Sequence, residues 1–197
     1  MSKRLTTPKG KAVYPHINTP DTAFGQNHYT CKLHVSEEDY RAFEANLKSM
    51  YDKAYEAECT KHGKKFPHND FPVHITPDGD FEIKTRQAAE KGNYKFTVAV
   101  VDSKGEVLPN PPLIGSGSVL RLGVEPSFYV ASGKFGVSLR LRAAQILELV
   151  EVGGAGGSFS FTAEEDGYVG NGESFNLDEE KSETVAAKAE EEDAFSF

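Results

Sequence analysis

Alternating polarity within residues 111–150 constrains the fold more than any other feature of the chain. Apolar side chains occupy every second position in two runs, at Leu120, Leu122 and Val124 and then at Val137, Leu139 and Leu141. Arginines take alternate positions, at Arg121, Arg140 and Arg142. A period of two is that of a β-strand. We therefore predict two long strands joined by a hairpin, with one apolar face and one arginine-bearing face.

Aromatic and basic residues gather at the tip of this predicted hairpin. They are Phe128, Tyr129, Lys134 and Phe135. A strand pair that buries its apolar face in a small barrel would present cations and flat rings on the other face. Such groups bind the phosphates and the unstacked bases of a single nucleic acid strand. The hairpin therefore favours a nucleic-acid-binding surface.

The preceding part of the chain predicts further strands and one helix. We expect strands at residues 11–19, interrupted by Pro15, and at 28–35 and 81–87. Residues 95–101 are apolar on both parities, which predicts a central strand covered on both sides. Ser36 followed by acids caps a helix that Gly63 can end. Its apolar stripe comprises Tyr40, Phe43, Leu47, Met50, Tyr51 and Ala54.

These elements predict a mainly β fold: a single OB-fold barrel with one helix after the second strand, followed by a disordered acidic C-terminal tail. Residues 1–150 hold 20 Lys and Arg against 17 Asp and Glu, whereas residues 151–197 hold 2 against 13. We expect an OB-fold domain at 1–152, a Gly-rich linker with a short apolar segment at 153–162, and the tail at 163–197, which ends in an aromatic motif.

The outward parity of the predicted strands supplies most candidate contacts to nucleic acid. Taken singly, each cation has a simpler interpretation as a solvated surface charge. Phe128 and Tyr129 lie between Pro126 and Gly133, where a core role for both rings is hard to arrange. For Tyr129, stacking on a base and packing both remain open. The candidates are Tyr14, His16, Lys84, Arg86, Arg121, Phe128, Tyr129, Lys134, Arg140 and Arg142.

The C-terminus predicts a second, protein-binding motif. Its candidate residues are Glu190, Glu191, Glu192, Asp193, Phe195 and Phe197. Acids followed by phenylalanines suit a partner pocket with an apolar slot ringed by Arg or Lys. A merely solubilising tail would explain the acids but not the two phenylalanines. A tethered anionic segment would also compete with nucleic acid for the basic body.

No residue pattern predicts catalysis, a cofactor or a metal site. His62, His68, His74 and Asp70 have neither helical nor strand spacing toward a shared metal ion, and no nucleophile–base pattern is present. We expect Cys31 and Cys59 to be reduced thiols. Apolar runs are too short to span a membrane, and the basic N-terminus lacks the apolar segment of a signal peptide. These features predict a cytoplasmic protein without membrane contact.

Several segments resemble the single-stranded DNA-binding proteins of T-odd phages. They are residues 16–21, VVDSKG at 100–105, GSGS at 115–118, GYVGNG at 167–172 and the terminal Phe197. The resemblance covers nearly the whole chain, and it implies that Tyr129 is the stacking tyrosine and Lys84 a DNA-contacting lysine. Two departures are Gln26-Asn27, where the family has a basic residue, and a tail that ends in Phe-Ser-Phe.

The resemblance implies a phage protein of DNA replication, recombination and repair that acts in the host cell cytoplasm. Such proteins coat single-stranded DNA, anneal complementary strands and recruit a DNA polymerase and helicase/primase through the tail. A homodimer or a cooperative assembly on DNA is a further expectation. The alternatives are an acidic inhibitor or scaffold that mimics nucleic acid and binds a host replication factor, or a nuclease or another phosphate-handling enzyme.

Overall fold

The computed structural model describes residues 3–150, which form ten strands and one long helix in that range. The first strands are β1 (Leu5–Thr6), β2 (Gly10–Asp21) and β3 (His28–Val35), with a single 3-10 turn, η1 (Ala23–Gly25), before β3. Helix α1 (Glu37–His62) follows, as predicted, the second of the long strands. The predicted linker at 153–162 and tail at 163–197 lie outside the described residues.

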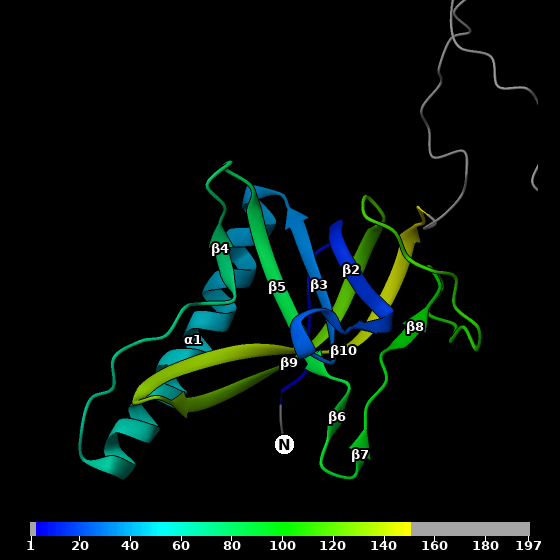
Figure 1. Ribbon diagram of the computed structural model, residues 1–197. Helices are drawn as coiled ribbons and strands as arrows, with labels where there is room; N and C mark the ends of the chain where they lie inside the picture. Colours follow the sequence, from blue (N-terminus) through cyan, green and yellow to red (C-terminus); the bar gives the residue numbers. More distant parts are fainter. Residues whose placement is uncertain (1–2, 151–197) are drawn as a thin grey trace, which may run out of the picture. The chain divides into compact units, whose positions relative to one another are not determined.

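Seven strands follow the helix (Figure 1). They are β4 (Val73–Ile75), β5 (Phe81–Ala88), β6 (Glu90–Lys91), β7 (Tyr94–Lys95), β8 (Ala99–Val101), β9 (Val119–Ala131) and β10 (Lys134–Glu148). The main sheet has the order β4-β5-β3-β2-β9-β10-β8, with β1 on β9, and β6 pairs with β7 in a separate hairpin. All of these pairs are antiparallel except β8 with β10.

The barrel is OB-like but is not closed by hydrogen bonds in the described part of the chain. The strand order runs from β4 to β8 without returning to its start. Strands β5 and β10 nevertheless pack against each other. The line along which they meet, which we call the β5–β10 seam, is held by side chains rather than by a backbone ladder.

The helix forms where its capping signals predict it. The Ser36 hydroxyl accepts a hydrogen bond from the Asp39 amide at 3.3 Å, and Gly63 ends the helix at φ 63°. That left-handed conformation is one that glycine adopts without steric cost. The stripe side chains Tyr40, Phe43, Leu47 and Tyr51 are buried, so α1 covers one side of the core.

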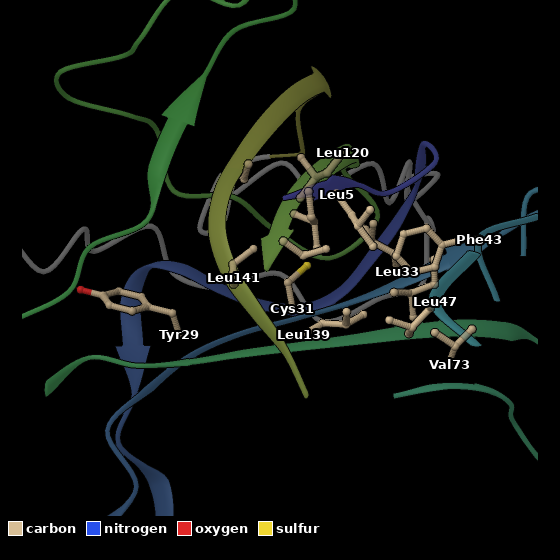
Figure 2. Close-up of a cluster of buried hydrophobic side chains, with 14 of the residues drawn as sticks. Leu5, Tyr29, Cys31, Leu33, Phe43, Leu47, Val73, Leu120, Leu139 and Leu141 are labelled. Carbon is tan, nitrogen blue, oxygen red and sulfur yellow. The ribbon is translucent and has the colours of Figure 1, made fainter. Parts of the chain in front are cut away.

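The core lies between this helix and the inner faces of the long strands. Figure 2 shows side chains of β3, β9 and β10 meeting those of α1. Leu33, Leu47, Leu120 and Leu141 are fully buried. Each such side chain contributes about 1.5–3 kcal/mol by leaving water, so the predicted apolar parity is what holds the sheet in shape.

One predicted strand is wrong over most of its length. Residues 95–101 form a three-residue strand, β8, at the end of the sheet, and not a central strand. Lys95 belongs to the β6–β7 hairpin, and Phe96 and Val98 are only half-buried. The two-residue turn at Gly92-Asn93 directs the chain away from the sheet before β8 begins.

Candidate nucleic-acid interface

Cationic side chains are aligned across the outer face of β2, β3 and β5. Lys84 lies opposite Lys32, and Arg86 lies opposite Thr30, which in turn faces His16. Residues directly opposite in an antiparallel pair share one face of the sheet. The predicted residues Lys84, Arg86 and His16 therefore lie on one surface, with Lys32 added to them.

A cavity of about 210 Å³ opens at the β5–β10 seam. It brings together three of the predicted cations, because β5 supplies Arg86 while β10 supplies Arg140 and Arg142. The complete lining, which we call the seam pocket, is His28, Arg86, Gln87, Ala88, Lys91, Phe96, Ser138, Arg140 and Arg142. Four permanent cations beside one aromatic ring form a surface suited to a phosphate and an adjacent base.

Arg142 is held in place by an acid and a ring. Its Nε and Nη2 both lie 2.9 Å from Oε2 of Glu125, and its guanidinium carbon is 5.9 Å from the centre of the Phe96 ring. Both contacts fix a planar cation without enclosing it, since about a third of the Arg142 side chain stays exposed. The guanidinium is thus oriented before any ligand binds.

Arg86 is held by neutral partners. Its Nη2 donates to Oε1 of Gln26 at 3.2 Å and lies 3.4 Å from Nδ1 of His28. A guanidinium only donates, so Nδ1 accepts and the neutral imidazole carries its proton on Nε2. Burial, and then the charge of Arg86, lower the pKa of His28, while Asp21 opposes them. Arg86 therefore keeps its full charge available to an anion.

Tyr129 is a fixed, half-exposed ring on the outer face of β9. It lies opposite Gly136 of β10, and a methyl group at Gly136 would come within 2.8 Å of the ring carbon Cζ. Asn69 Nδ2 donates to the tyrosine hydroxyl at 3.1 Å. The ring therefore rests against a glycine backbone and is held at its hydroxyl.

Several known proteins share this architecture. The curated single-stranded DNA-binding protein of Escherichia phage T7 is 30% identical over 132 residues, or 58% of this chain. The match covers 57% of that relative, so the chain spans less than two thirds of its length. No family model matches the chain.

Solved structures of phage proteins have the same fold as this chain. The crystal structure of gp2.5, a single-stranded DNA-binding protein of bacteriophage T7, aligns with a TM-score of 0.69 at 24% identity, covering 86% of this chain and all of that one. The fold is that of the phage single-stranded DNA-binding proteins. A second example, from bacteriophage Enc34 in complex with single-stranded DNA, has a TM-score of 0.57 at 12% identity over 75% of this chain and 88% of that one. The resemblance expected from the sequence is confirmed.

Within this phage fold, Phe128 lies on the opposite face of β9 from Tyr129. Its ring stacks on Phe135 with centroids 6.4 Å apart and planes 4° apart, and it lies 6.4 Å from Tyr51 of the helix. Of the two neighbouring rings, Phe128 packs against the buried core and Tyr129 does not. The half-exposed Tyr129 ring instead lies on the outer face of β9.

The remaining predicted contacts are dispersed over the fold. Lys134 is exposed at the hairpin tip, and Arg121 is exposed on β9 opposite Gln145. Tyr14 is 73% exposed, with its amide donating to the Ser116 hydroxyl at 3.0 Å. Its φ of 45° and the register shift between Val13 and His16 break the alternation that would place Tyr14 and His16 on one face. Their roles remain predictions.

Sequence reasoning missed part of the seam pocket and its surroundings. Phe96 lay inside a segment interpreted as a core strand, and Lys91 lay in a stretch for which no element was predicted, although Gly92-Asn93 is a two-residue hairpin signal. Lys32 lies on the outward-facing parity of its strand, so this signal could have added it to the candidate contacts. Arg4, in the basic N-terminal arm, lines a neighbouring cavity together with Arg142 and Glu125.

The described residues contain neither a cluster of metal ligands nor a membrane-spanning helix. Among residues 3–150, no group of three or more His, Cys, Asp or Glu side chains is arranged to hold a metal ion. No helix in that range combines the length and the apolar character needed to cross a membrane.

Proposed function

We propose that this protein binds single-stranded DNA without sequence preference, as a non-enzymatic component of phage DNA replication and recombination in the host cytoplasm. The observation that carries the proposal is the seam pocket, which joins Arg86, Arg140 and Arg142 to Phe96 on a fold of the phage single-stranded DNA-binding type. Cations supply affinity without sequence choice, and a ring face stacks on any base.

The strand would cross the outer face at the seam. Its phosphates would meet Lys84 and Arg86 of β5 and the two arginines of β10, while Tyr129 offers a ring face beyond Ser138. Stacking contributes about 1–3 kcal/mol per base. Because Tyr129 and Arg142 are already fixed by their neighbours, little conformational entropy is lost when DNA binds.

Fluorescence anisotropy with labelled oligo-dT tests the proposal. We expect micromolar or tighter binding that weakens as salt rises, and R86A and R140A should each weaken it and lower the salt slope by about one. K53A, which removes an exposed lysine of helix α1 outside the seam pocket, is the matched control. Absence of binding, even after residues 177–197 are deleted, would refute the proposal.

We further propose that the C-terminal acids and Phe195 and Phe197 recruit a DNA polymerase and a helicase/primase. The support is the residue pattern, an acidic run followed by two phenylalanines. Replacing both phenylalanines by alanine should abolish capture of the replication enzymes while leaving oligo-dT affinity unchanged. Equal capture by the two forms in a pull-down would contradict this part of the proposal.

A further inference from the structure

We infer that the β6–β7 hairpin (residues 90–95) is a further DNA-binding element, in which Tyr94 stacks on a base next to the seam pocket and Lys91 binds a neighbouring phosphate. The inference rests on the proposed function. It adds a contact that lies outside the long hairpin and outside the outer face of β2, β3 and β5.

The hairpin places Tyr94 beside the seam pocket. Lys91 and Tyr94 are directly opposite each other in the two-stranded ladder, so their side chains share one face of the hairpin. Lys91 lines the seam pocket, and so does Phe96, which follows the second leg. The ring of Tyr94 is therefore presented on the same face as a pocket residue. Figure 1 shows this hairpin projecting from the body between β5 and β8.

Tyr94 contributes no visible packing to the fold. The residue is 74% exposed, the highest value for a large hydrophobic residue in the described range. A tyrosine ring buries a large apolar area when it is covered, and leaving it in water forgoes that gain. An uncovered ring that shares a hairpin face with Lys91 of the seam pocket has the composition of a base-stacking platform.

The hairpin is anchored although its tip is exposed. The buried Ala89 donates its amide to the Asn27 carbonyl at 2.9 Å, and Phe96 donates its amide to the Ala89 carbonyl at 2.8 Å. Gly92 has a φ of 59°, which closes the two-residue turn without steric strain. The two legs are thus fixed at their base, and Tyr94 is held out from a supported frame.

Charge favours DNA rather than an apolar protein partner on this hairpin. Glu90 lies opposite Lys95, and its Oε1 accepts a hydrogen bond from Asn27 Nδ2 at 3.3 Å. Lys91 has no acid opposite it in the ladder, and its neighbours in the seam pocket include Arg86 and Arg140. A single tyrosine among lysines and arginines matches a base between phosphates.

Substitution of Tyr94 in the full-length chain tests this inference. We expect Y94A to weaken oligo-dT binding by about 5- to 150-fold, which corresponds to the loss of one stacked base, and Y94F to bind like wild type. K91A should weaken binding and lower the salt slope by about one. V107A removes an apolar side chain of similar exposure outside the hairpin and should change nothing. Because Tyr94 is exposed, the thermal midpoint of Y94A should match that of wild type.

Photocrosslinking provides a second readout. Oligo-dT carrying 5-iododeoxyuridine should crosslink to Tyr94, as mapped by mass spectrometry. If Y94A binds like wild type and crosslinks form elsewhere while R86A still binds weakly, the hairpin inference is overturned and the proposed function stands. If the wild-type chain binds no oligo-dT at all, the proposed function itself fails.

Discussion

Gly136 determines where the Tyr129 ring can lie. A Cβ at this position would come within 2.8 Å of the ring carbon Cζ and 2.9 Å of the hydroxyl, so the ring can rest on β10 only because position 136 has no side chain. The adjacent contact from Asn69 fixes the same ring at its hydroxyl. The candidate stacking surface is therefore built by three residues, of which only the tyrosine would touch DNA.

We predict that G136A displaces the Tyr129 ring. The crowding should lower the free energy of unfolding by about 1–3 kcal/mol, as overpacking does, and should weaken oligo-dT binding as measured by anisotropy. In a Y129A background the same substitution should have no further effect on binding. An equal loss of affinity in both backgrounds would show that Gly136 acts independently of the tyrosine.

The pKa of His28 gives a prediction of pH dependence. Burial and then Arg86 lower it from 6.5, with Asp21 acting in the opposite direction. As the pH falls through 6.5, the unfolded chain takes up a proton at this residue that the folded protein binds less readily, so stability decreases. Thermal midpoints from pH 7.5 to 5 should therefore fall more steeply for wild type than for H28Q. Parallel curves would contradict the prediction.

Among the strands, β5 shows how an outer face is organised. Glu82 points to the same side as Lys84 and Arg86, as its parity predicts, yet only 4% of its side chain is exposed. Its carboxylate lies 3.5 Å from Lys32 Nζ, 3.4 Å from His34 Nε2 and 3.3 Å from His74 Nε2. These pairs join β3, β4 and β5 through one acid on the cationic face.

We predict that Glu82 is a structural tie between these three strands. E82Q should lower the free energy of unfolding by about 1–3 kcal/mol, because a buried carboxylate that lies within ion-pair distance of Lys32, His34 and His74 is replaced by a neutral amide. E106Q, at an exposed glutamate in a turn, is the matched control. Urea denaturation of both variants measures the difference, and equal midpoints would exclude the tie.

Sequence periodicity predicted the elements whose two faces differ. Strand β3 and helix α1 have the predicted bounds because alternation or a helical stripe, together with caps, marks both ends. The prediction of a central strand at residues 95–101 was wrong because Phe96 and the valines are as apolar as the residues of a core strand. Phe96 instead lies beneath the guanidinium of Arg142. The seam pocket could not be predicted, since nothing local to β5 or β10 specifies that their arginines meet.

For the molecule as a whole, charge is distributed unevenly along the chain. The first 150 residues carry an excess of cations, whereas residues 151–197 hold 13 acids against 2 bases. A tethered polyanion acts at millimolar effective concentration on any cationic surface that it can reach. The sequence therefore predicts that DNA affinity depends on the presence of the acidic segment.

We predict that deleting residues 177–197 tightens oligo-dT binding several-fold at low salt and permits binding of duplex DNA. The gain should diminish as salt rises, because screening weakens competition by the acids. Anisotropy titrations at several salt concentrations measure it, with a chain whose residues 177–197 are acid-free as the length-matched control. Identical affinities for the full-length and shortened proteins would exclude electrostatic competition.

The strand order leaves β5 and β10 unbonded to each other at the backbone, within the part of the chain that the structure describes. Separating these two strands breaks side-chain contacts but no backbone hydrogen bond of the sheet. We expect the barrel to open first at this seam, because the remaining ladders stay intact when β5 and β10 separate. Under the proposed function, such a seam would let the protein take up and release DNA strands of any composition without unfolding.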